Sequence, residues 1–177
     1  MDHNFETKIQ KDLHQYLTQA KMTDAHLPEC PDVEEKWQEL VQAYLTDGIR
    51  EFTKYPTVSL GWIMFLGMAV AKYWDTDWEK YGSMSGLYET IRDVRGYDCM
   101  DEYILESVLG MDEAQCRHIS DIVAECASRV NNALHHEHIE PGTPAAFHAY
   151  VSCLHQLYLM GMAMQLNNMG YHMTRIN

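Results

Sequence analysis

The stretch VSLGWIMFLGMAVAKYW, residues 58–74, decides the fold of this chain. Between Leu60 and Ala71 it contains only apolar side chains and two glycines, and a run that is apolar on every face is typical of a helix surrounded by other helices. These twelve residues are fewer than the roughly 18 to 20 needed to cross a bilayer. Charged residues follow at once, at Lys72 and Asp75. The stretch therefore predicts a central core helix and not a membrane span.

A second largely apolar helix is predicted at residues 143–168. The sequence PGTP at residues 141–144 places Thr143 as an N-terminal cap and a proline in the first helical turn. The residues that follow are apolar almost all round, so this helix should also be buried. We expect it to pack against residues 58–74, because two apolar helices bury most surface against each other.

The other predicted helices are amphipathic and should surround these two. Apolar residues recur at steps of three and four, with polar residues between them, over residues 5–20, 33–52 and 119–134. Asp32 with Glu35 and Asp112 with Gln115 have the spacing of capping boxes. The sequence predicts an all-α fold. We expect one domain over residues 1–177, a bundle of about six or seven helices around the two apolar ones.

Charge and cysteine usage exclude several classes of partner. The chain has 26 acidic and 13 basic residues and a formal charge of −13, which opposes binding to nucleic-acid phosphates or to an anionic membrane. Its five cysteines form no CxxC pair and read as free thiols in a reducing compartment. No secretory signal is visible at the amino terminus. We therefore expect a cytoplasmic protein without a nucleic-acid or membrane partner.

No motif in the sequence names a reaction. GxGxxG, a phosphate-binding loop, HExxH and GxSxG are all missing, and no histidine follows a glutamate by three residues, as di-iron carboxylate bundles require. Whether the protein is an enzyme stays open at this point, and its catalytic residues are unknown. We expect no cofactor, with a divalent metal ion as the alternative.

Histidines are the candidate metal ligands. His148 and His155 share one face of the second apolar helix but lie two turns apart, roughly 10 Å, so each would need ligands from other helices. His118 and His136 lie on a polar flank of the helix that contains residues 119–134. These residues define the alternative hypothesis, a metal-binding bundle acting as a hydrolase or transferase through a metal-bound water.

His135 and His138 lie one turn apart in the segment LHHEHIE and form half of a possible zinc or nickel site. The competing interpretation is that they sit at the carboxyl end of a helix, where donor side chains favour the free carbonyl groups. We favour this second interpretation for both residues.

The leading hypothesis is a non-enzymatic interaction module that acts as a homodimer or binds an unknown protein partner. It depends on more large apolar residues than two buried helices need, namely Trp74, Trp78, Tyr81, Met162 and Met169. A third hypothesis, a carrier of apolar ligands, depends on Gly61, Gly67 and Gly161, which leave space along the central helices. Close approach of the helices explains these glycines more simply than a pocket does.

Overall fold

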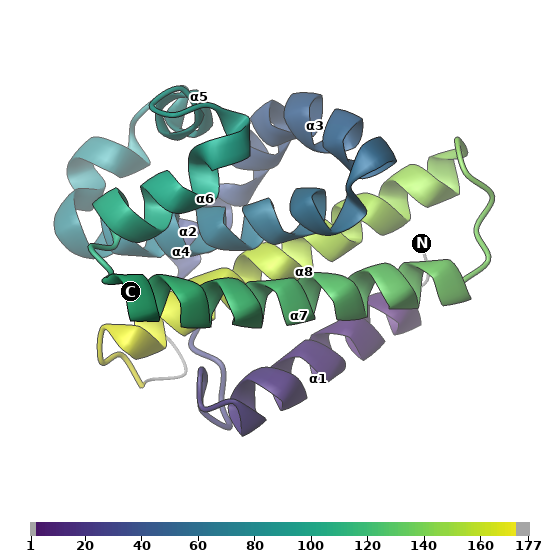
Figure 1. The fold of residues 1–177 in the computed structure, drawn as a ribbon, viewed down its shortest axis with the longest axis horizontal. Coiled ribbons are helices and arrows are strands. Elements are labelled where there is room, and N and C mark those ends of the chain that lie inside the picture. The colour runs from purple at the N-terminus through teal and green to yellow at the C-terminus, as the bar shows by residue number, and fades with distance from the viewer. Residues whose placement is uncertain (1–2, 173–177) are drawn as a thin grey trace.

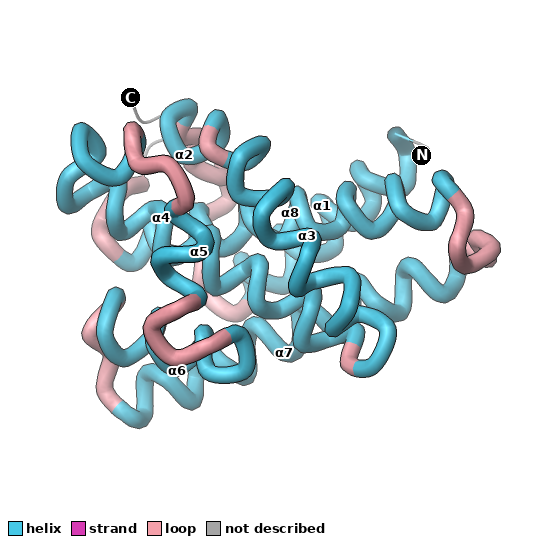
Figure 2. Tube along the Cα trace, turned by 90° about the horizontal axis from the view of Figure 1, so that it is seen from above, coloured by secondary structure: helices cyan, strands magenta, loops and turns pink. Residues whose placement is uncertain are grey.

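The computed structural model describes residues 3–172, and these form helices without any strand (Figures 1 and 2). The predicted all-α bundle is confirmed. The eight α-helices of the described residues are α1 (His3–Gln19), α2 (Pro31–Glu35), α3 (Trp37–Lys54), α4 (Pro56–Gly82), α5 (Leu87–Arg92), α6 (Met100–Tyr103), α7 (Glu113–His136) and α8 (Pro144–Asn168). A 3-10 turn, Tyr97–Cys99, and a π-helical segment, Ile104–Val108, flank α6.

The two apolar helices predicted at residues 58–74 and 143–168 form the centre of the bundle as α4 and α8. They run in the same direction. The Tyr150 hydroxyl lies 2.5 Å from the Ser59 hydroxyl near the start of both helices, and just beyond α8 the Tyr171 hydroxyl donates to Asp75, in the carboxyl-terminal half of α4, at 2.5 Å. The chain returns between them through α7, which packs along α4 in the opposite direction (Figure 1).

The amphipathic helices cover this pair. α1 lies against α7 and α8, and α3 lies against α4 (Figure 1). Their apolar faces join one continuous core with the two central helices. Among the described residues, every helix is too short or too polar to span a bilayer.

Local signals in the sequence explain where the long helices begin. The Asp112 carboxylate accepts from the Gln115 backbone N–H at 2.8 Å, and the Gln115 side-chain oxygen accepts from the Asp112 backbone N–H at 3.0 Å. This capping box is therefore confirmed. Thr143 caps α8 as predicted, accepting from the Ala146 N–H at 3.2 Å. The capping box predicted for Asp32 is wrong, because the helix already begins at Pro31 and Asp32 lies inside its first turn. The Asp32 carboxylate instead accepts from the Trp74 indole N–H at 3.1 Å.

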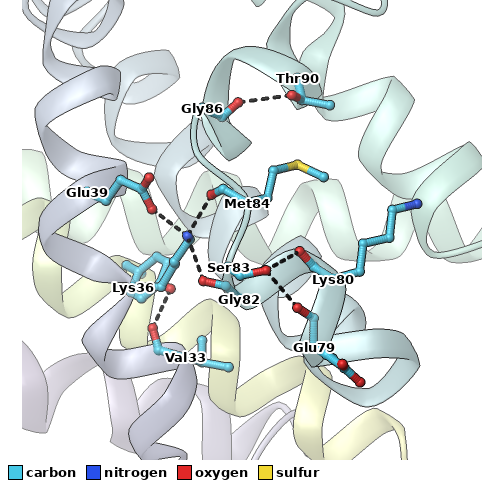
Figure 3. Close-up of polar contacts among 11 residues, drawn as sticks. Val33, Lys36, Glu39, Glu79, Lys80, Gly82, Ser83, Met84, Gly86 and Thr90 are labelled. Carbon is cyan, nitrogen blue, oxygen red and sulfur yellow. Dashed lines mark hydrogen bonds and ion pairs between the residues drawn. The ribbon is translucent and has the colours of Figure 1, made fainter.

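Lys36 joins the start of the bundle to the far end of α4 (Figure 3). Its side chain is only 8% exposed, and its ammonium donates to the carbonyl oxygens of Gly82 at 3.1 Å and Met84 at 2.9 Å. The third partner is the Glu39 carboxylate. All three ammonium donors are therefore used, and they satisfy carbonyl groups that the end of α4 leaves free.

Candidate functional site

One cleft stands out from the others on the described part of the chain by its chemistry. Of five well-formed clefts, four have aspartate or glutamate in their walls. The fifth, which we call the apolar groove, has a volume of about 590 Å³ and no carboxylate in its lining. Its walls are Ile49, Phe52, Thr53, Pro56, His135, Pro141, Gly142, Thr143, Ala146, Phe147 and Tyr150.

The groove carries apolar side chains that are open to solvent. Ile49 on α3 is 46% exposed and Phe147 on α8 is 43% exposed, and both line the groove. Tyr55, 61% exposed, stands beside the lining residue Pro56. The fourth large exposed apolar residue of the described chain, Val94, lies outside the groove. Two of the four such residues therefore belong to this one surface, and a third borders it.

The junctions α3–α4 and α7–α8 lie toward the same end of the bundle (Figure 1), and residues of both line the groove. Pro56 begins α4 and ends α3 at Lys54, because a residue before proline is disfavoured in helical conformation. On the opposite wall, Gly142 adopts a positive φ of 80°, which lets the chain turn into the Thr143 cap of α8. Sequence signals for helix ends thus place the two walls.

A buried hydrogen-bond network fixes the floor of the groove. The Tyr150 ring packs against Phe52 with centroids 4.8 Å apart, and its hydroxyl donates to the Ser59 hydroxyl at 2.5 Å. Ser59 in turn donates to the carbonyl oxygen of Gly48 at 2.8 Å. A Cβ at Gly48 would lie only 2.7 Å from the Tyr150 hydroxyl, so this position needs a glycine. Burial raises the pKa of Tyr150, which stays neutral as a hydrogen-bond donor.

Charged side chains stand near the groove. Arg50 and Lys54 are exposed on α3 beside the lining residues Ile49 and Thr53. The Arg50 guanidinium is 3.6 Å from Asp47, and its side chain is 73% exposed. Glu51 and Glu140 stand equally close in sequence to the lining residues Phe52 and Pro141, so the surroundings of the groove carry both signs of charge.

The residues predicted for interaction lie elsewhere. Met162 is inside the core at 3% exposure, and Trp74, Trp78, Tyr81 and Met169 are half-buried against it. The first three belong to the carboxyl-terminal half of α4, whereas the apolar groove lies at the start of that helix. The structure therefore does not bring these five residues into the groove.

His155 is the one candidate metal ligand that is partly buried, with 36% of its side chain exposed. Its ring stacks on Trp37 with centroids 4.9 Å apart and planes at 22°, and its Nδ1 lies 3.9 Å from the Glu6 carboxylate. Burial lowers the pKa of His155 below its ordinary value, and Glu6 opposes this effect. His148, two turns earlier, is exposed next to the Phe147 ring.

The other four candidate ligands are on the surface. His118, His135, His136 and His138 are all exposed. His136 is the last residue of α7, and its Nδ1 lies 2.7 Å from the carbonyl oxygen of Asn132, in keeping with the helix-end interpretation. Among residues 3–172, no three histidine, cysteine or carboxylate side chains come together as metal ligands.

Sequence reasoning placed Ile49 and Phe52 in the apolar stripe of a helix and gave Phe147 no role. A signal was present, because the stripe of α3 continues to the last turn before Pro56, where the helix leaves the core. What the sequence could not supply is the neighbour, since Phe147 is almost one hundred residues further along the chain.

No protein-family model, no curated protein and no solved structure matches this chain. We therefore infer its function from the residues themselves.

Proposed function

We propose that this protein is an interaction module without catalytic activity, which forms a homodimer through the apolar groove. One observation carries the proposal: this groove combines exposed large apolar side chains with walls free of carboxylates. Contiguous exposed apolar surface is uncommon on monomers and is typical of sites that bind another protein.

Charge favours this surface for self-association. Two copies of a chain with net charge −13 repel each other, and acidic residues at the contact would add short-range repulsion. The apolar groove has no acidic residue in its walls and so avoids this short-range repulsion. A second copy therefore meets less short-range repulsion at these walls than at the four clefts that have carboxylates in their lining.

Shape supports a two-fold arrangement. A dimer with two-fold symmetry uses the same patch on both copies, so that patch must contain both a projection and a hollow. Phe147 and Ile49 project at the rim, and the hollow of about 590 Å³ lies between them and Tyr150. We expect Phe147 of each copy to enter the groove of the other, as buried aromatic anchors do at interfaces.

The test is the mass in solution of the full chain, measured by sedimentation equilibrium. The wild type should have twice the chain mass of 20.5 kDa. Phe147→Glu should shift it to the single-chain mass, because each interface would bury two unpaired carboxylates. A glutamate in the first turns of α8 suits the helix dipole, so this change should leave the fold intact.

Val94→Glu is the matched control, since Val94 is 55% exposed and outside the groove. It should dimerise like the wild type. A wild-type protein that remains monomeric at high concentration, or a Phe147→Glu variant that still dimerises, would contradict the proposal.

A further inference from the structure

A second cleft, separate from the apolar groove, has the composition of a small-molecule site. It lies between α4, α6 and α7, has a volume of about 450 Å³, and is called here the Asp101 cleft. This volume falls within the roughly 300 to 1,000 Å³ of typical ligand pockets. Its lining is Thr57, Val58, Gly61, Trp62, Phe65, Asp101, Ser120, Val123, Ala124 and Ser128.

Small residues keep the cleft open. The α7 wall presents Ser120, Ala124 and Ser128, spaced one turn apart, and the α4 wall includes Gly61. A Cβ at Gly61 would lie 3.2 Å from the Val123 side chain. Of the three glycines considered for a ligand carrier, Gly61 is therefore the one that lines a cleft, whereas Gly67 and Gly161 face backbone.

Two aromatic residues provide a fixed apolar wall. The Trp62 indole N–H donates to the carbonyl oxygen of Tyr97 at 2.7 Å, which sets the orientation of its ring. Phe65 packs edge-on against Trp62, with centroids 5.6 Å apart and planes at 77°. Fixed aromatic rings bind flat apolar groups and attract organic cations through their faces.

Asp101 is the one charged residue in this lining. No described lysine or arginine forms an ion pair with it. Burial raises the pKa of Asp101, hydrogen bonds from the backbone N–H groups of Glu102 and Asp101 itself oppose this effect, and the nearby carboxylates of Glu102 and Glu106 add to it. A partly buried carboxylate without a cationic partner is costly, and a bound cation would relieve that cost.

We infer that the Asp101 cleft binds a small organic ammonium ion with an aromatic or branched apolar body. The ammonium group bonds to the Asp101 carboxylate, while the apolar body lies against Trp62, whose ring the buried Phe65 supports. Ser120, Ser128 and Thr57 place hydroxyl groups along the rest of the lining. The acidic chain as a whole attracts cations to this site.

Phenethylammonium is the probe, titrated into the full-length protein at neutral pH by isothermal titration calorimetry. Phenethyl alcohol has nearly the same shape without the charge. The wild type should bind the ammonium about 10 to 100 times more tightly than the alcohol, as expected for a hydrogen bond between charged groups. Equal affinities for the two probes, or binding of neither, would overturn the inference.

Two variants locate the binding. Asp101→Asn should bind both probes with similar affinity, whereas Glu140→Gln, which removes one exposed negative charge elsewhere, should keep the preference for the ammonium. Ala124→Leu should fill the cleft and abolish binding of both probes, and Ala114→Leu on the same helix should not. Thermal unfolding confirms that each variant is folded. A preference for the ammonium that survives in Asp101→Asn would refute the assigned role of this carboxylate.

Discussion

Gly67 of α4 and Gly161 of α8 bring the two central helices into direct backbone contact. A Cβ at Gly67 would lie 2.2 Å from the carbonyl oxygen of Tyr158, and one at Gly161 would lie 2.1 Å from that of Met64. Neither position has room for a side chain, and the opposing atoms are main-chain atoms that cannot rotate away. The glycines thus set how closely α4 and α8 approach, and with it the packing of the core around them.

Gly67→Ala should destabilise the protein by about 1–3 kcal/mol, the usual cost of overpacking a well-packed core. The better helix propensity of alanine, worth about 1 kcal/mol, offsets only part of the strain. Unfolding in urea, followed by circular dichroism, measures the difference.

Gly61→Ala is the matched control, because its new Cβ would lie 3.2 Å from a Val123 methyl group that is able to move. It should change stability much less than Gly67→Ala does. Equal losses in the two variants would mean that the backbone contact between α4 and α8 has no special role.

The two central helices were predictable because a helix that is buried on all sides is apolar on all sides, and this is visible in its sequence. Residues 58–74 and 143–168 lack a polar face, and no knowledge of their neighbours is needed to see it. The capping residues Asp112 and Thr143 were predictable for a similar reason, since their partners lie three residues away.

The apolar groove was not predictable, because it depends on which helix ends become neighbours. Ile49 looks like a core residue in the stripe of α3, and only its position beside Phe147 makes it part of an open surface. His155 also gave no sign that its ring would stack on Trp37, which is far from it in sequence. The spacing of apolar residues along a helix and the amino-acid composition do not reveal contacts between residues that are far apart in the sequence.

Lys36 likewise resembles a surface residue in the sequence, yet it is 8% exposed and binds Gly82, Met84 and Glu39. Lys36→Met keeps most of the side-chain volume and removes the charged donor. We expect a loss of about 1.5–3 kcal/mol in the free energy of unfolding, because two partly buried carbonyl groups lose a charged partner.

Urea unfolding tests this, with Lys11→Met as the control, since Lys11 is an exposed helical lysine. The control should change stability by less than about 0.5 kcal/mol. If both variants were equally stable, the hydrogen bonds from Lys36 to the end of α4 would contribute little to the stability of the fold.

His155 should make stability depend on pH below neutrality. Its pKa in the folded protein is lowered by burial, so the unfolded chain binds this proton more readily than the folded chain does. Its contribution to stability is therefore complete above the unfolded pKa of about 6.5 and decreases as pH falls toward the folded pKa. The loss cannot exceed about 1.4 kcal/mol per pH unit.

His155→Phe retains an aromatic ring against Trp37 but does not titrate. The wild type should lose stability relative to this variant between about pH 7 and about pH 5, whereas titration of carboxylates distant from residue 155 affects both proteins alike. The measurement is urea unfolding of both proteins over that range. A constant difference between them would exclude the predicted proton uptake by His155.

Salt should strengthen the proposed homodimer. Two chains of charge −13 repel over long distances, and the Debye length falls from about 10 Å at 0.1 M salt to about 3 Å at 1 M. The contact itself, at the apolar groove, has no carboxylates in its walls and should gain from salt rather than lose. We therefore expect the dimer dissociation constant to fall several-fold over this range, as measured by sedimentation equilibrium. Phe147→Glu should stay monomeric at both salt concentrations. A dimer that weakened with salt would instead be held together by ion pairs, which would place the interface at one of the charged clefts and away from Phe147.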